Sequence, residues 1–236
     1  MCRTTLTLGL TGLALLHAGP AATWLPVVRR RLPGLAGAGD ADHVALTFDD
    51  GPDPRSTPRF LAELDRLGCR ATFFVVGETL ARHPDLGRRT VAEGHEVAVH
   101  GWRHRNALLT RPGRVTGEIA RAADLVAAVT GAEPVWYRPP YGVLSAETLT
   151  AARRRGLRPV LWTTWGRDWT RSADPDSVLA TLAPGLRGGA TVLLHDCDHT
   201  SAPGAWRSAL GALPGLVARC RELGLRVGPL AEHGVS

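Results

Sequence analysis

After Asp40, two kinds of apolar pattern alternate along the chain. Short runs with strand character occur at residues 44–48, 71–76, 96–99, 135–137, 159–163, 191–194 and 225–227. Segments with apolar residues at helical spacing lie between them, at residues 57–67, 80–93, 115–130, 146–155, 175–182 and 205–223. Strands that alternate with helices predict a parallel sheet covered by helices. The fold class expected is therefore α/β, a distorted (β/α) barrel of about seven parallel strands, with an open doubly wound sheet as the alternative.

The first predicted helix carries clear start and stop signals. Thr57 and Pro58 open it, Leu61, Leu64 and Leu67 supply an apolar stripe, and Gly68 follows. A capping residue before a proline in the first turn, and a glycine after the last turn, are typical of helix ends.

The N-terminal segment, residues 1–39, has a different character. Residues 4–28 are mostly apolar and Arg29, Arg30 and Arg31 follow them. The segment fits a secretion signal, an uncleaved membrane anchor or an apolar arm packed on the domain. Arginines after an apolar stretch would keep the rest of the chain in the cytoplasm. The balance favours an extracytoplasmic or membrane-anchored location over a cytoplasmic one, with residues 4–28 making a possible membrane or cell-envelope contact.

Composition and charge narrow the class of protein. The 236 residues are 44% hydrophobic and 21% charged, which excludes a wholly disordered, collagen-like or multi-span membrane protein. Much of the net charge of +6 lies in residues 1–39, which carry four arginines and no acid. The nearly balanced remainder does not indicate a nucleic-acid surface. We expect residues 40–236 to form a single domain, and the oligomeric state stays open.

Polar side chains follow several of the predicted strands. Asp49 and Asp50 end the first, and His100 and His104 come after the third. An Asp-Asp-Gly sequence is often only a turn. If the chain is helical from residue 100, however, the two imidazoles share one face and either aspartate completes a site for a divalent metal. One carboxylate would bind the metal while the other accepts a proton from water.

Three further strand ends carry reactive groups. Arg138 precedes two prolines, Asp168 lies in a tryptophan-rich segment, and His195 ends a buried apolar run. Arg138 could pair with an active-site carboxylate, and His195 could act as a general acid. Because strand-to-helix loops of a barrel open on one face, we expect these groups to meet there.

Together these residues closely resemble the polysaccharide deacetylase family, carbohydrate esterase family 4, from about residue 44 to residue 195. The family contains chitin, chitooligosaccharide and peptidoglycan N-deacetylases. The resemblance implies a metal-dependent hydrolase that removes N-acetyl groups from amino sugars of a carbohydrate substrate. The motif TFDDG then supplies Asp49 as the catalytic base and Asp50 as a metal ligand, and HGWRH supplies His100 and His104 as further ligands. The metal is usually zinc, with cobalt or nickel as alternatives.

The remaining motifs imply further roles. Arg138 of RPPYG would position the base, and the Tyr141 backbone amide would stabilise an oxyanion. His195 would protonate the departing amine. Leu193 and Trp169 would line the pocket for the acetyl methyl group.

Two positions depart from the family pattern. Gly101 stands where Ser or Thr is usual, and Trp165 stands where the family has an aspartate. The acid that tunes His195 would then be Asp168 or Asp196. An O-acetyl esterase or a small-metabolite deacetylase would use the same site. A carbohydrate-binding protein with weakened catalysis is a further alternative, because six tryptophans could stack on sugar rings: Trp102, Trp136, Trp162, Trp165, Trp169 and Trp206.

Overall fold

The computed structural model describes residues 16–235. Within these residues the strands are β1 (His43–Asp49), β2 (Thr72–Val75), β3 (Glu96–Val99), β4 (Trp136–Tyr137), β5 (Arg158–Pro159), β6 (Thr164–Trp165), β7 (Thr191–His195) and β8 (Arg226–Gly228). The helices of the barrel are α4 (Thr57–Leu67), α5 (Gly77–Arg82), α6 (Pro84–Ala92), α7 (Arg114–Thr130), α8 (Ala146–Arg154), α9 (Pro175–Leu182) and α10 (Trp206–Glu222). Before β1 come a short 3₁₀ helix, η1 (Gly19–Trp24), and two single-turn helices, α2 (Pro26–Arg29) and α3 (Pro33–Ala36).

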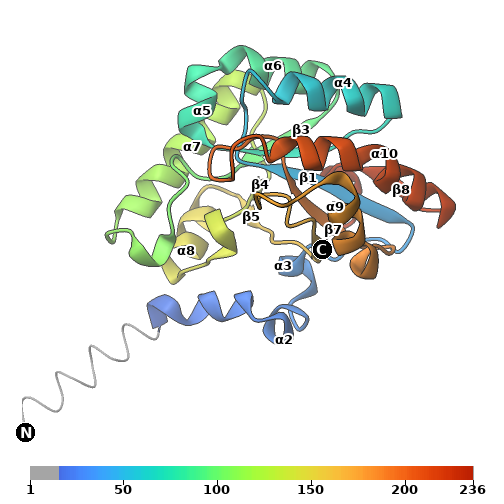
Figure 1. Ribbon diagram of the computed structural model, residues 1–236. Helices are drawn as coiled ribbons and strands as arrows, with labels where there is room; N and C mark the ends of the chain where they lie inside the picture. Colours follow the sequence, from blue (N-terminus) through green and yellow to red (C-terminus); the bar gives the residue numbers. More distant parts are fainter. Residues whose placement is uncertain (1–15, 236) are drawn as a thin grey trace, which may run out of the picture.

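The sheet is parallel throughout and forms a distorted (β/α) barrel. Its order is β5-β4-β3-β2-β1-β7-β6, and β8 pairs with the first half of β1. Helices α4 and α6 cover one side of the curved sheet, as Figure 1 shows. The predicted barrel of about seven parallel strands is confirmed, and β8 adds a short eighth.

The predicted strand at residues 159–163 is divided. Its first residues form β5 at one edge of the sheet, whereas β6, five residues after β5, forms the opposite edge. The sheet is so strongly curved that residues 160–163 connect its two edges directly. The α3 segment lies at this gap, where the Leu161 amide donates to the Leu35 carbonyl at 2.7 Å.

Helix boundaries follow the local signals. Helix α4 ends at Leu67 because Gly68 takes a left-handed conformation with φ of 62°. The single helix expected at residues 80–93 is instead two helices, α5 and α6. His83 is not helical and Pro84 begins the second helix, because the residue before a proline avoids helical geometry.

The core lies on both faces of the sheet. Val44, Leu46 and Phe48 of β1 pack against the surrounding helices, whereas Ala45 faces the barrel interior. This alternation directs Thr47 and Asp49 inward as well. The first strand is therefore buried on both faces and carries a carboxylate into the interior at its carboxyl end.

The N-terminal segment is described from residue 16 onward, so residues 4–15 of its apolar stretch lie outside the described residues. None of the helices in residues 16–235 has both the length and the hydropathy to cross a membrane. In Figure 1 the segment lies on the side of the barrel away from α4 and α6.

Candidate active site

Strand register brings the candidate base and acid together. Asp49 of β1 is the register partner of His195 of β7, and Thr47 is the partner of Leu193. Partners in neighbouring parallel strands project from the same face of a sheet. The carboxyl end of the barrel therefore presents Asp49 and His195 side by side.

Arg138 fixes the Asp49 carboxylate. Its guanidinium is fully buried and donates to Asp49 Oδ1 at 2.8 Å, to Thr47 Oγ1 at 2.7 Å and to the Leu161 carbonyl at 2.8 Å. Burial lowers the pKa of Arg138, while the Asp49 carboxylate opposes that change. Because Arg138 holds Oδ1, the other oxygen of Asp49 faces His100, with Oδ2 3.7 Å from Nε2.

Asp50, His100 and His104 form a group with the chemistry of a metal site. Their ligand atoms all lie within 4.8 Å of one another. Asp50 Oδ1 is 3.4 Å from His100 Nε2 and 3.2 Å from His104 Nε2. Among the described residues this buried oxygen has no hydrogen-bond partner, which fits a cation at this position. Two imidazoles and one carboxylate are a common ligand set for a catalytic divalent metal.

The tautomer of His100 also fits metal binding. Its Nδ1 lies 2.7 Å from the Arg138 carbonyl, which can only accept, so Nδ1 carries the proton. The Nε2 lone pair then faces Asp50 Oδ1. Such a hydrogen bond, donated by the ring nitrogen that does not bind metal, is the usual support of a histidine ligand.

The electrostatics favour a charged Asp50 beside a neutral His104. Burial would raise the pKa of Asp50, but the nearby imidazoles of His100, His104 and His195 outweigh burial and lower that pKa well below its usual range. Burial also lowers the pKa of His104 to about 4, despite the opposing charge of Asp50. A neutral imidazole and an ionised carboxylate are the forms that bind a metal.

The helix considered for residues 100–104 does not form. These residues form an irregular loop in which Gly101 has a φ of 80°. Glycine adopts this left-handed geometry at little cost, and the turn still brings His100 and His104 to Asp50. The i, i+4 spacing predicted the correct pair of imidazoles through a conformation that does not occur.

Asp168 is the acid that contacts His195. Its Oδ1 lies 3.1 Å from His195 Nδ1, and its Oδ2 accepts the His195 backbone N–H at 2.8 Å. Burial opposes an imidazolium here, but the charges of Asp168, Asp50 and Asp49 raise the pKa of His195 to about 10. His195 is therefore protonated at neutral pH.

Asp196, the other acid considered for tuning His195, has a different position. It accepts hydrogen bonds from the Gly51 amide and the Thr57 hydroxyl. Burial raises its pKa to about 7. Asp196 therefore supports the turn that follows Asp50, and Asp168 alone of the two contacts the imidazole.

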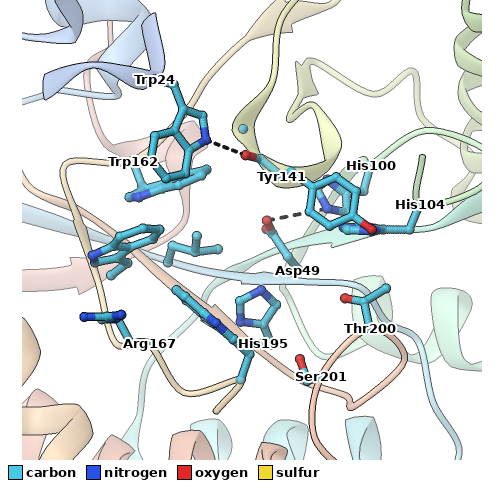
Figure 2. Close-up of a pocket in the computed structure, with 14 residues that line it drawn as sticks. Trp24, Asp49, His100, His104, Tyr141, Trp162, Arg167, His195, Thr200 and Ser201 are labelled. Atoms are coloured by element: carbon cyan, nitrogen blue, oxygen red, sulfur yellow. Dashed lines mark hydrogen bonds and ion pairs between the residues drawn. The ribbon is translucent and has the colours of Figure 1, made fainter. Parts of the chain in front are cut away.

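A cavity of about 380 Å³ joins these groups, and Figure 2 shows its lining residues. Its polar lining includes Asp49, His100, His104 and His195. The apolar wall is formed by Leu193, Tyr141, Gly142 and four tryptophans: Trp24, Trp162, Trp165 and Trp169. A largely apolar cleft with a few convergent ionisable groups is typical of a small-molecule or glycan site.

Comparison with known proteins decides the family. A family model described as Polysaccharide deacetylase matches residues 36–160. The chain is 37% identical over 199 residues to a chitooligosaccharide deacetylase of Bradyrhizobium sp. (strain ANU 289), a match that covers 80% of this chain and 89% of that protein.

This chain belongs to the polysaccharide deacetylase family.

Solved structures agree with this assignment. One is a peptidoglycan N-acetylglucosamine deacetylase, with 26% identity, a TM-score of 0.80, and coverage of 89% of this deacetylase and 97% of that chain. Another is a family 4 carbohydrate esterase from Streptomyces lividans in complex with acetate, with 32% identity, a TM-score of 0.71, and coverage of 80% and 93%. These comparisons confirm the predicted family and the predicted class of enzyme, a metal-dependent hydrolase.

The cavity contains only some of the tryptophans that the sequence suggested for sugar stacking. Trp162, Trp165 and Trp169 line it, with the first two stacked at 5.7 Å between ring centroids. Trp102, Trp136 and Trp206 do not, and each is at most 8% exposed. These three are core residues of the deacetylase.

Sequence reasoning missed residues of the deacetylase site, among them Trp24 and Thr200. Trp24 precedes the predicted barrel and carries no motif, so nothing in the sequence indicated it. Thr200 lies in the loop after β7, and its hydroxyl donates to Asp50 Oδ2 at 2.6 Å. The only signal for Thr200 is its place shortly after His195, in a loop that opens on the reactive face.

Proposed function

We propose that the protein removes N-acetyl groups from acetylated amino sugars in a chitin-like or peptidoglycan glycan. The observation that carries the proposal is that Asp49, His100, His104 and His195 line one cavity, with Asp50 grouped beside the two imidazoles of His100 and His104. The printed names of the similar proteins, a chitooligosaccharide deacetylase and a peptidoglycan N-acetylglucosamine deacetylase, support this substrate class.

The residues divide the chemistry between them. Asp49, held by Arg138 through Oδ1, accepts a proton from the water that attacks the acetyl carbonyl. The Tyr141 backbone N–H donates to the oxyanion that develops. His195, protonated and oriented by Asp168, gives its proton to the departing amine.

Asp50, His100 and His104 would hold the metal, for which we propose zinc, with cobalt or nickel as substitutes. When bound, such an ion polarises a carbonyl and lowers the pKa of water. Leu193 and Trp169 of the same cavity are proposed to contact the acetyl methyl group, because both are apolar and both border His195.

Acetate release tests the proposed function. The substrates are chitooligosaccharides, peptidoglycan fragments and acetylated xylan, each with and without added zinc or cobalt. We expect metal-dependent release from the first two, and its loss in Asp49→Asn with the metal retained. His100→Ala should instead lose the metal. Release by Asp49→Asn at the wild-type rate would refute the role of the base, and release from xylan alone would indicate an O-acetyl esterase.

We also propose an extracytoplasmic or envelope location, supported by the apolar stretch at residues 4–28 and by the polymeric substrate class. Cell fractionation tests it, since recovery only in the cytoplasmic fraction would contradict it.

A further inference from the structure

The N-terminal segment reaches the active site through Trp24. Its indole lines the cavity together with Asp49 and His195, although 25 residues separate it from Asp49 in the chain. The Trp24 Nε1–H donates to the Tyr141 carbonyl at 2.8 Å. Figure 2 shows Trp24 and Thr200 on opposite sides of Asp49. Part of the apolar wall of the cavity is therefore supplied by the segment that precedes the barrel.

Three other residues of the N-terminal segment also contact the barrel. The Leu161 amide and the Thr191 hydroxyl donate to the carbonyls of Leu35 and Gly37. Nearer to Trp24, the Arg29 guanidinium lies 5.5 Å from the ring centroid of Trp162. These contacts hold residues 29–37 against the barrel, and the hydrogen bond to the Tyr141 carbonyl holds Trp24 at the end of η1 in the same way.

The exposure of Trp24 distinguishes it from a packing residue. It is 49% exposed, whereas Trp162 in the same wall is 5% exposed. Its ring meets Trp165 edge to face, with centroids 6.2 Å apart. A half-exposed indole that lines a cavity and contacts a second indole is suited to bind a sugar ring, because it offers an apolar face and a large contact area.

Besides its contact with Trp165, Trp24 restrains the backbone at Tyr141 through its hydrogen bond to the Tyr141 carbonyl. Tyr141 has a φ of 59°, a left-handed conformation that is unfavourable for a residue with a side chain. The same peptide segment carries the backbone N–H assigned above to the oxyanion. Through the Tyr141 carbonyl, the Trp24 indole restrains the loop that presents this N–H.

Resting on the proposed function, we infer that Trp24 is a substrate-binding and loop-positioning residue. Its ring packs on the pyranose ring next to the reacting N-acetyl group, and its Nε1–H holds the Tyr141 loop. The N-terminal segment is accordingly a component of the substrate site. Specificity for the sugar ring then depends on Trp24 as well as on the barrel loops.

Two substitutions separate the two contacts. Trp24→Ala removes both, and we expect KM for a chitooligosaccharide to rise about tenfold, as for loss of one aromatic contact. Trp24→Phe keeps an aromatic ring but not the N–H, so KM should stay within about twofold while kcat falls about fivefold, the effect of one net hydrogen bond. Leu25→Ala, an exposed neighbour outside the cavity, is the matched control and should leave both constants unchanged.

A binding measurement separates this inference from the proposed function. Calorimetric titration of N-acetylchitotetraose into Asp49→Asn, with and without Trp24→Ala, needs no turnover. Tenfold weaker binding of the double variant supports the inference. Equal affinities, or equal KM values for Trp24→Ala and wild type, overturn the substrate contact, and an unchanged kcat for Trp24→Phe overturns the positioning role. Absence of acetate release by the wild type would instead refute the proposed function.

Discussion

The contact between Asp168 and His195 allows a quantitative test of the general acid. Asp168→Asn preserves the shape of the side chain and an oxygen that can accept the His195 amide proton, but it removes the negative charge 3.1 Å from Nδ1. Asp168 is 1% exposed, so solvent screens this interaction little. Because that charge is a main cause of the raised pKa of His195, the substitution should lower the pKa.

The size of the shift follows from the distance. Two unit charges 3.1 Å apart interact by about 5 kcal/mol at an effective dielectric constant of about 20, and by about 1.3 kcal/mol in bulk water. One pKa unit corresponds to about 1.36 kcal/mol. The pKa of His195 should therefore fall by at least about one unit and by no more than about four.

The assay is the pH dependence of kcat on a chitooligosaccharide. A general acid must be protonated, so activity is lost as the pH rises through its pKa. The alkaline limb of Asp168→Asn should lie at least about one pH unit below that of the wild type. Asp176→Asn, which removes an exposed acid from the first turn of α9, is the control and should not move that limb. An unshifted limb in Asp168→Asn would refute the assignment of His195 as an acid tuned by Asp168.

The contact between Asp168 and His195 should also make the free energy of unfolding depend on pH. A histidine whose folded pKa is raised stabilises the fold fully below its unfolded pKa of about 6.5. This contribution is lost as the pH rises to about 10. The difference in free energy of unfolding between wild type and Asp168→Asn should accordingly shrink over that range in urea denaturation curves. If the difference in free energy of unfolding does not vary with pH, the raised pKa of His195 does not come from the charge of Asp168.

Two other substitutions probe the supports of the site. Arg138→Met leaves the buried Asp49 carboxylate without its cation, so the free energy of unfolding should fall by about 3–5 kcal/mol in urea denaturation; a loss below about 1 kcal/mol would show that the pair is not needed for stability. Thr200→Val removes the hydroxyl that orients Asp50, so metal affinity should fall about 10- to 100-fold in competition with a chromophoric chelator. Thr200→Ser restores the hydroxyl and should bind like the wild type, and equal affinity of Thr200→Val would exclude this orienting role.

The local signals in the sequence predicted the elements well, because each depends on residues close together in the chain. Helix α4 begins at Thr57 and ends before Gly68, within one residue of what the local signals indicate. The capping position is Ser56, not the predicted Thr57, and the Ser56 side chain makes no capping hydrogen bond. The apolar run of β1 and the carboxylates that end it also followed from local pattern. Since parallel strands of a barrel all end on one face, the sequence was sufficient to predict that Asp49, His100 and His195 meet.

Only the tertiary structure decided contacts between distant segments. The choice of Asp168 over Asp196 as partner of His195 depends on which carboxylate the loop after β6 brings to the imidazole. The irregular loop from His100 to His104 depends on the turn at Gly101. The spacing of the two histidines was also compatible with a helix and could not reveal this turn.

The same reason explains the division of the strand expected at residues 159–163. An apolar run does not reveal where a curved sheet closes, and here the closure separates β5 from β6. Trp24 is the clearest case, because its place in the cavity depends on contacts of Leu35 and Gly37 with segments more than a hundred residues away. Local pattern thus determined the barrel and its reactive face, whereas long-range packing determined which side chains complete the site.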